Sequence, residues 1–407
     1  MRVLLSTIGS RGEAQPVIAL AVQLQELGQE AVVCAPPDFQ EWAESLGIAY
    51  VPVGPELHAT AKQPTGVVPT PEQRRQMIEG TVADQFTTVG SAADGCDVIV
   101  AGGALAIAAH SVAEQRGIGY VYAAFAPVTL PSPRHAPPVF GLLGQKPADG
   151  TVDNQTLWAE DAQRWNVMWS AALNAQREAA GLAPVSDVSG HIFTDTPWLA
   201  ADPTLAPWPK PSELDVLQTG AWTVTDHRRL SPELEEFLDA GEPPIYFGFG
   251  SVRVPDGIAR TMITAARALG RRAILARGWA GLSLDEAAPD CLAIGEVNQQ
   301  ALFQRVAAVV HHGGAGTTTT AAGAGSPQVI IPQTFDQFYF AHRVDRLGIG
   351  SAHPVSDPTA GSFTAALHHV LDPRVAKTAH ALAGHVRTDG ALTAARRLIE
   401  KVAVLAG

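Results

Sequence analysis

A glycine-rich turn between a predicted strand and a predicted helix constrains the fold of this chain more than any other feature. The apolar run 307–310 predicts a buried strand, 311–316 (HHGGAG) a tight turn, and Thr317 the start of a helix. Such a turn is typical of a βαβ unit, and it leaves backbone N–H groups unpaired and directed at one point. The sequence therefore predicts an α/β fold with an anion site at this turn.

The residue types in the turn favour a diphosphate as the anion. The glycines let the backbone come close to phosphate oxygens, two threonines add hydroxyl donors, and a histidine can add a ring N–H. The dipole of the following helix also favours negative charge. The predicted site residues are His312, Gly313, Gly314, Ala315, Gly316, Thr317 and Thr318.

A second predicted strand, 328–331, is followed by the pair Asp336-Gln337. In an α/β unit this pair lies at the carboxyl end of the neighbouring strand, beside the phosphate site. A carboxylate next to an amide suits the vicinal hydroxyls of a pyranose, which both donate and accept. A glycine-rich turn alone often binds nothing, and a lone Asp-Gln pair usually belongs to a surface loop. The two features together, each following one of two adjacent predicted strands, predict a site for a sugar diphosphate.

Length and composition favour two domains and exclude some partners. A chain of 407 residues with 46% hydrophobic residues can bury two cores. The net charge of −12 argues against nonspecific binding to nucleic acid or anionic membranes, which requires a basic surface. The three dispersed cysteines are expected to be reduced core residues, and we expect neither a leader peptide nor a membrane-spanning segment. We expect a cytoplasmic protein, and a monomer suffices for closure around a ligand.

Strand and helix patterns alternate in two series, separated by a Pro-rich stretch. This rhythm predicts two Rossmann-like domains, each with a doubly wound parallel sheet, facing each other across a cleft. We predict an N-terminal domain over 1–202, a linker over 203–222, a C-terminal domain over 223–385 and a terminal helix within 386–407. Pro16 predicts the first turn of the first helix.

Several motifs resemble those of the family 1 glycosyltransferases of the GT-B fold. The closest likeness is to bacterial enzymes of natural-product biosynthesis, especially those that act on glycopeptide antibiotic aglycones. The resemblance covers essentially the whole chain. The motifs that carry it are Gly9-Ser10-Arg11-Gly12, Gly248-Phe249-Gly250-Ser251, Ile294-Gly295-Glu296-Val297-Asn298, the HHGGAGTT run and Asp336-Gln337.

The resemblance implies an inverting transfer of a sugar from a UDP- or dTDP-sugar to a hydroxyl of a small natural-product acceptor. The C-terminal domain would hold the nucleotide sugar and the N-terminal domain the acceptor, with the C-terminal helix returning to the N-terminal domain. The implied contacts are His312 with the α-phosphate, Thr317 and Ser251 with the β-phosphate, Asp336 and Gln337 with the sugar, and backbone near Val297 with the base.

No Asp-x-Asp motif lies near the predicted site. Fixed N–H groups, the helix dipole and His312 can stabilise the leaving diphosphate in place of a metal. We therefore predict a metal-independent enzyme with no resident cofactor, whose nucleotide sugar is a co-substrate.

Glu13 is the candidate base for the acceptor hydroxyl, with Ser10 orienting it, and Asp336 joins them as a catalytic candidate. Members of the resembled family usually carry Asp at the position of Glu13. The alternative is that Glu13 only complements the dipole of the helix that follows it. Arg11 either reaches phosphate or caps the cleft, and Trp279 packs near the base or in the core. His135, in a Pro-rich loop, is a reserve candidate for the base.

Three other functions fit parts of the sequence. An NAD-type oxidoreductase requires G-x-G-x-x-G and a following acidic residue, whereas Gly9 and Gly12 give only G-x-x-G. A nucleotide-sugar epimerase would share the fold and donor site but need no acceptor. A nucleotide-sugar-binding homologue that has lost catalysis and acts as a partner protein would also keep the donor site.

Overall fold

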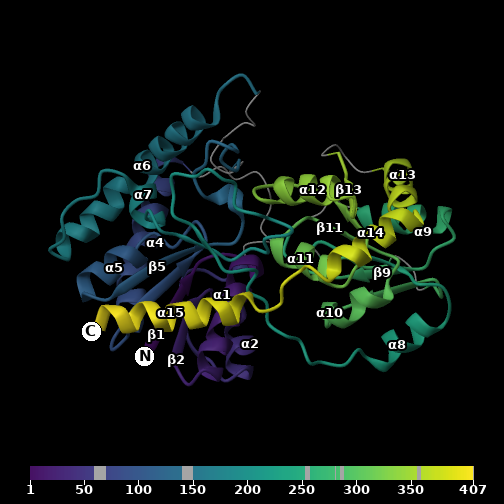
Figure 1. Cartoon of the computed structure of the whole chain (residues 1–407), viewed down its shortest axis with the longest axis horizontal. Coiled ribbons are helices and arrows are strands. Elements are labelled where there is room, and N and C mark those ends of the chain that lie inside the picture. Colours follow the sequence, from purple (N-terminus) through teal and green to yellow (C-terminus); the bar gives the residue numbers. More distant parts are fainter. Residues whose placement is uncertain are drawn as a thin grey trace.

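The computed structural model describes residues 1–58, 70–139, 150–252, 257–279, 281–284, 288–354 and 359–406. They form two α/β domains, each built on one parallel sheet (Figure 1). Within these residues, no helix is both long and apolar enough to cross a membrane. The three cysteines, Cys34, Cys96 and Cys291, are free and buried, as expected.

The first sheet has the order β3-β2-β1-β4-β5-β6-β7. Its central strands are apolar on both faces because helices cover both sides. Val3 and Leu5 of β1 pack toward α1 and α15, and Leu4 packs toward α4 and α5. The strands are β1 (Arg2–Thr7), β2 (Glu30–Ala35), β3 (Ala49–Pro52), β4 (Val98–Gly102), β5 (Gly119–Ala124), β6 (Trp198–Leu199) and β7 (Leu217–Gln218).

The helices of the first domain lie between these parallel strands in the chain. The long ones are α1 (Arg11–Glu26), α4 (Pro71–Ala92) and α6 (Asn154–Ala179). The short ones are α2 (Gln40–Ser45), α5 (Ala109–Arg116) and α7 (Val188–Phe193), with single 3₁₀ turns η1 (Pro37–Phe39) and η2 (Pro127–Thr129).

The second sheet has the order β10-β9-β8-β11-β12-β13, with helices on both faces. Its strands are β8 (Ile245–Gly248), β9 (Ala273–Ala276), β10 (Cys291–Ile294), β11 (Ala308–His311), β12 (Gln328–Ile330) and β13 (Gly350–Ala352). Its helices are α8 (Pro232–Asp239), α9 (Ile258–Ala268), α10 (Gln299–Leu302), α11 (Ala315–Gly323), α12 (Gln337–Arg346), α13 (Ala360–Val370) and α14 (Pro373–Ala383), with the 3₁₀ turn η4 (Phe303–Arg305).

The strand order reverses once in each sheet, between β1 and β4 and between β8 and β11. In open parallel sheets, ligands bind outside the carboxyl ends of the strands at such reversal points. The loops that follow β1 and β4 lie at one reversal point, and those that follow β8 and β11 lie at the other. The predicted site residues Ser251 and His312 belong to these loops, and Glu13 lies in the first turn of the helix that follows β1.

The first helix begins earlier than predicted. α1 starts at Arg11, with Ser10 as its N-cap, so Pro16 lies inside the helix rather than in its first turn. Glu13 is consequently the acidic residue of the first turn. This start brings Glu13 to the carboxyl end of β1, at the reversal point of the first sheet.

The segment 203–222 differs from the linker that its prolines predict. Leu217 and Gln218 form β7, which pairs with β6 at the edge of the first sheet. Leu205, Ala206 and Trp208 are buried in a hydrophobic cluster. Proline stiffens this segment without excluding it from the domain, because an edge strand needs few ladder hydrogen bonds.

The C-terminal helix α15 (Gly390–Ala406) returns to the first domain (Figure 1). Ala391, Ala394, Ala395 and Leu398 are buried there in the same cluster as residues of α1. The two chain segments that cross between the domains touch at Gly220 and Gly390, where a Cβ on Gly390 would lie 2.3 Å from the Ala221 carbonyl oxygen. The predicted return of the last helix is thus present in the structure.

Candidate functional site

The turn between β11 and α11 has an open helix N-terminus. Gly314 is the N-cap, and no side chain accepts a hydrogen bond from the first-turn N–H groups. The first backbone N–H groups of a helix have no partner within the helix, so those of Ala315, Gly316 and Thr317 point outward from its end. They converge where the positive end of the helix dipole lies, which makes this corner a site for an anion.

The three glycines of the turn serve different purposes. A Cβ on Gly313, whose φ is +94°, would lie 2.6 Å from Ile330 Cγ2, so this glycine allows β12 to approach. A Cβ on Gly314 would lie 2.6 Å from His312 Nε2. Gly316 is exposed, and a Cβ there would meet nothing within 4 Å. Only at Gly316 does the missing side chain simply leave room for a ligand.

Two adjacent histidines lie in the turn between β11 and α11. His311 is fully buried, accepts from the Gly313 N–H at Nδ1 (3.1 Å) and lies 2.9 Å from Gln328 Oε1 through Nε2. His312 Nδ1 is buried without a hydrogen-bond partner, and its ring packs beside Gly250. Burial lowers the pKa of His312 to about 4, so the ring is neutral at pH 7. A neutral ring with an unpartnered buried nitrogen fits the predicted contact with a ligand oxygen.

The threonines of α11 differ from the prediction. Thr318 is fully buried, its hydroxyl donates to the Gly314 carbonyl (2.9 Å), and its N–H donates to the same oxygen (3.0 Å). Thr318 therefore cannot donate to an anion, because helix geometry directs its hydroxyl back along the preceding turn. The half-buried Thr317 is the threonine of this turn that remains a donor candidate.

The pair Asp336-Gln337 lies at the N-terminus of α12, just beyond β12. β12 pairs with β11, so the pair lies beside the anion corner as predicted. Gln337 Oε1 accepts from the N–H groups of Gln333 (2.8 Å) and Thr334 (3.2 Å), which leaves its amide NH₂ as the group for a ligand. Burial and then the nearby Glu13 raise the pKa of Asp336 to about 7.

Ser251 and Val297 follow two other strands of the second sheet. Ser251 comes three residues after β8, next to Gly250, and is half-buried. Val297 comes three residues after β10 and packs partly against a core cluster. Both lie at the carboxyl edge of the sheet, where the prediction requires them. Their contacts with phosphate and base stay predictions.

Glu13 faces the second domain from the first. Its Oε2 accepts from the Ser10 hydroxyl (3.0 Å), while Ser10 also caps α1. Burial raises the pKa of Glu13 above its ordinary value, against the opposing hydrogen bond from Ser10. Because the Glu13 charge also raises the pKa of Asp336, the two carboxyl groups lie across the cleft within electrostatic reach of each other. The structure therefore groups Ser10, Glu13 and Asp336, the three catalytic candidates.

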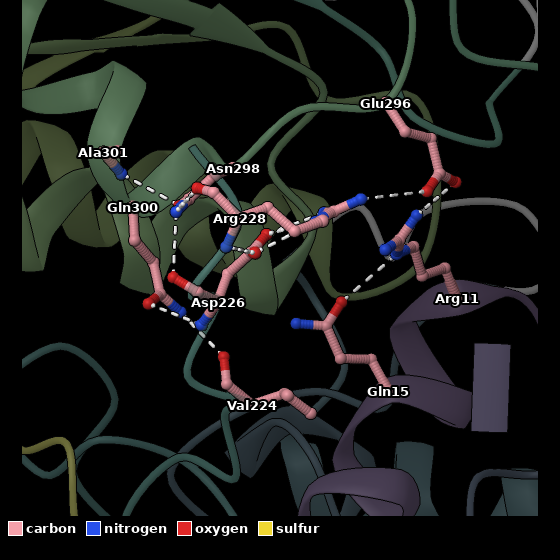
Figure 2. Close-up of polar contacts among 9 residues, drawn as sticks. All are labelled: Arg11, Gln15, Val224, Asp226, Arg228, Glu296, Asn298, Gln300 and Ala301. Atoms are coloured by element: carbon pink, nitrogen blue, oxygen red, sulfur yellow. Dashed lines mark hydrogen bonds and ion pairs between the residues drawn. The ribbon is translucent and has the colours of Figure 1, made fainter. Parts of the chain in front are cut away.

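Arg11 and Trp279 both make contacts between the domains. Arg11 Nη1 lies 2.6 Å from Glu296 Oε1, and its guanidinium lies 5.0 Å from the ring of Trp42 (Figure 2 shows the ion pair). The ring of Trp279 stacks on Phe39 at 6.3 Å and contacts His58 at 5.5 Å. Arg11 thus bridges the two domains through its ion pair, and Trp279 packs against residues of the first domain. The contacts of Arg11 with phosphate and of Trp279 with the base stay predictions.

These contacts border a cavity of about 430 Å³ between the domains. Residues from both domains line it, and Glu296 places it next to Val297, where the base is predicted. Its lining residues are Arg11, Pro37, Asp38, Phe39, Trp42, Glu56, His58, Trp279 and Glu296.

Sequence reasoning missed a polar clamp on the segment that enters the second domain. Asn298 Nδ2 donates to the carbonyls of Asp226 and Arg228 (2.8 Å each), and Gln300 Nε2 donates to the Val224 carbonyl (2.8 Å) (Figure 2). Asp226 in turn holds Arg228, whose Nη1 lies 4.0 Å from Glu296. Asn298 ends the motif that contains Val297, and Gln300 follows it, but their partners are 70 to 76 residues away in the chain.

His135, the reserve base, is held in the first domain. Its Nε2 lies 3.0 Å from the Leu130 carbonyl oxygen, and its ring packs against Trp158 and Trp208. Burial lowers its pKa. Its backbone partner and aromatic neighbours give it a role in ordering the Pro-rich loop.

One group in the described chain has the ligand types and spacing of a metal site: His110, Glu114 and His191, on α5 and α7. Arg177 donates to Glu114 and lies 3.4 Å from His191 Nε2, so a guanidinium already takes the place of a cation. The two imidazoles stack 4.3 Å apart at 15°, which does not direct both lone pairs at one point. The group lies apart from the reversal points of both sheets.

Comparisons with known proteins agree with this arrangement. Residues 3–132 match the glycosyltransferase family 28 N-terminal domain, and residues 274–394 match the erythromycin biosynthesis protein CIII-like C-terminal domain. The vancomycin aglycone glucosyltransferase of Amycolatopsis orientalis is 48% identical over 99% of this chain and 98% of its own length. The chain belongs to the GT-B glycosyltransferases.

Another relative and a solved structure extend the likeness. The dTDP-epi-vancosaminyltransferase of the same organism is 41% identical over 92% of this chain and 91% of its own length. The structure of the glycosyltransferase VinC in complex with dTDP matches with a TM-score of 0.66 at 22% identity, covering 99% of each chain. The resemblance to glycopeptide-type glycosyltransferases is confirmed.

Proposed function

We propose that this glycosyltransferase moves a sugar from a UDP- or dTDP-sugar to a hydroxyl of a glycopeptide or related natural-product aglycone. The observation that carries the donor class is the uncapped N-terminus of α11 beside the unpartnered His312 Nδ1. The similarity to an enzyme named for the vancomycin aglycone supports the acceptor class. A dTDP-nucleotide as the donor is supported by the relative named as a dTDP-epi-vancosaminyltransferase and by the similar structure of VinC in complex with dTDP.

We propose a single displacement that inverts the anomeric carbon. The acceptor oxygen forms its bond to the anomeric carbon while the bond from that carbon to the β-phosphate oxygen breaks. Glu13 takes the hydroxyl proton, and the nucleoside diphosphate leaves with the bonding electron pair. Glu13 and the α11 corner belong to opposite domains, which supports attack by the acceptor and departure of the diphosphate on opposite faces of the sugar, as inversion requires.

Charge stabilisation at the diphosphate is assigned to the protein rather than to a metal. The N–H groups of α11 are fixed before the reaction, so they stabilise developing charge without reorganisation. In this proposal Thr317 and Ser251 add hydroxyl donors, and Asp336 with the Gln337 amide orients the sugar. The expected enzyme keeps its full rate in a chelator.

The decisive experiment is a transfer assay with purified protein. UDP- and dTDP-sugars are each supplied with a glycopeptide aglycone, with and without EDTA, and the product's mass and anomeric configuration are measured. A product of inverted configuration, unaffected by EDTA, supports the proposal. A product of retained configuration contradicts the proposed inversion. Activity that is lost in EDTA and restored by magnesium or manganese contradicts the proposed metal independence.

The same assay separates the two remaining alternatives. A binding protein without catalysis would be stabilised by the donor, by about 2.7 kcal/mol at 100 times its dissociation constant, but would neither transfer nor hydrolyse it. An epimerase would convert the sugar nucleotide in the absence of any acceptor.

A further inference from the structure

Glu13 lies against two backbone positions that have no side chain. A Cβ built on Gly9 would lie 2.7 Å from both Cγ and Cδ of Glu13 and 2.8 Å from its Oε2. A Cβ built on Gly103 would lie 3.1 Å from Glu13 Cγ. Carbon atoms at optimal separation are about 3.5–4.0 Å apart, so a methyl group at Gly9 would force Glu13 out of this conformation, and one at Gly103 would press on the Glu13 stem.

The two glycines belong to the loops on either side of the reversal point of the first sheet. Gly9 follows β1 and Gly103 follows β4. The Thr7 hydroxyl donates to the Gly102 carbonyl (2.8 Å) and ties the ends of these strands together. The buried Gln85 side chain bonds to the Leu105 carbonyl (3.0 Å) and the Ala108 N–H (3.1 Å), which fixes the loop after Gly103. The slot between the loops therefore has rigid walls.

The carboxylate end of Glu13 is held separately from its stem. The Ser10 hydroxyl donates to Oε2 (3.0 Å), so the glycines confine the Cγ and Cδ atoms while Ser10 orients the oxygens. A glutamate has one methylene more than an aspartate, and it needs space for that atom. Gly9 and Gly103 provide the space.

We infer that Gly9 and Gly103 are positioning residues that hold the Glu13 carboxylate where the acceptor hydroxyl is deprotonated. The inference rests on the proposed role of Glu13 as base. Gly9 is the cleaner probe of the two. Gly103 has a φ of +78°, which strains any residue other than glycine. The φ of Gly9 is not positive, and the three atoms nearest to a Cβ built on Gly9 all belong to Glu13.

The test compares Gly9→Ala with Gly12→Ala. Gly12 lies in the same turn, but a Cβ there would meet only Ser10 Oγ, at 3.8 Å. We expect Gly9→Ala to lower kcat on the order of 100-fold, the cost of misplacing a reacting group by about an ångström, with the donor KM within about twofold of wild type. Gly12→Ala should keep the wild-type kcat. A folded Gly9→Ala enzyme with wild-type kcat would overturn the inference.

The Glu13→Ala background shows whether Gly9 acts through Glu13. Alanine at position 13 lacks the Cγ and Cδ atoms, so adding Gly9→Ala there should change neither the residual kcat nor the melting temperature. If Gly9→Ala alone fails to fold, recovery of folding in the double variant supports the same contact. An equal loss of kcat in both backgrounds would overturn the inference. Wild-type turnover by Glu13→Ala itself would instead remove the proposed base.

Discussion

The helix N-termini at α1 and α11 lie in equivalent places and are used in opposite ways. Each follows a parallel strand at the reversal point of its sheet. α1 is capped by Ser10 and carries Glu13 in its first turn, so its positive end is satisfied from within the protein. α11 has no side-chain cap and no acidic residue in its first turn. One terminus holds a carboxylate that can accept a proton, and the other is left for an external anion.

The largest expected effect comes from removing the carboxylate at α1. Glu13→Gln should lower kcat by about 10²–10⁴-fold, the usual contribution of a general base, and leave donor binding unchanged. Steady-state kinetics with saturating donor measure the first effect, and donor-induced thermal stabilisation measures the second. Near-normal turnover in a stable variant would show that Glu13 only complements the helix dipole.

A carboxylate in the first turn of α11 should make this helix N-terminus resemble that of α1, which already carries an acidic residue. Gly316→Asp puts a negative charge in the first turn, at an exposed position where a side chain meets nothing within 4 Å. Like charges brought together cost several kcal/mol, so the donor KM should rise on the order of 100-fold. Gly316→Asn has the same shape without the charge and serves as the control. Equal KM values for the two variants would argue against an anion at this corner.

A smaller effect should appear in the pH dependence of stability. The folded-state pKa of Asp336 is about 7 against an ordinary value of 3.8, so the folded protein holds this proton more tightly than the unfolded chain. Wild type therefore loses stability as pH rises from about 4 to about 7. Asp336→Asn lacks this loss, and its melting temperature relative to wild type should be higher at pH 8 than at pH 5. A pH-independent difference would contradict the buried, charge-coupled position of Asp336.

The smallest effect is expected at the ion pair between the domains. Arg11 and Glu296 are 38% and 68% exposed, so their pair contributes at most about 1 kcal/mol and is screened by salt. Glu296→Gln should raise the donor KM less than about fivefold at low salt and have almost no effect at high salt. Glu242→Gln removes an exposed partner of Arg271 in the same domain and is the matched control. A salt-independent loss would give Glu296 a direct role in binding.

The features that the sequence predicted depend on residues that are close together in the chain. Strand, turn and helix around His312 are contiguous, and Asp336 follows the next strand, so parallel-sheet geometry alone brings them together. The fold followed for the same reason. The strand β7 was not predicted because its two residues are too few to show an alternating hydrophobic pattern, and because prolines at 207, 209 and 211 suggested a linker.

What sequence did not predict depends on contacts between distant segments or on side-chain direction. Arg11 and Glu296 are 285 residues apart, and nothing in either local sequence indicates the other. Trp279 follows a strand of the second sheet but contacts Phe39 of the first domain. Thr318 carries the right hydroxyl at the right spacing, yet the helix turns that hydroxyl onto Gly314.

The position of α15 has a consequence for how the chain reaches its native state. Met1 and Val402 pack against one hydrophobic cluster, so the first domain is assembled from segments that precede and follow the second domain in the sequence. During synthesis the second domain, which is continuous in sequence, emerges whole before the first can be finished. A nascent chain that has been synthesised through the second domain but still lacks α15 would leave the apolar side of α1 exposed to water, where chaperones can bind it.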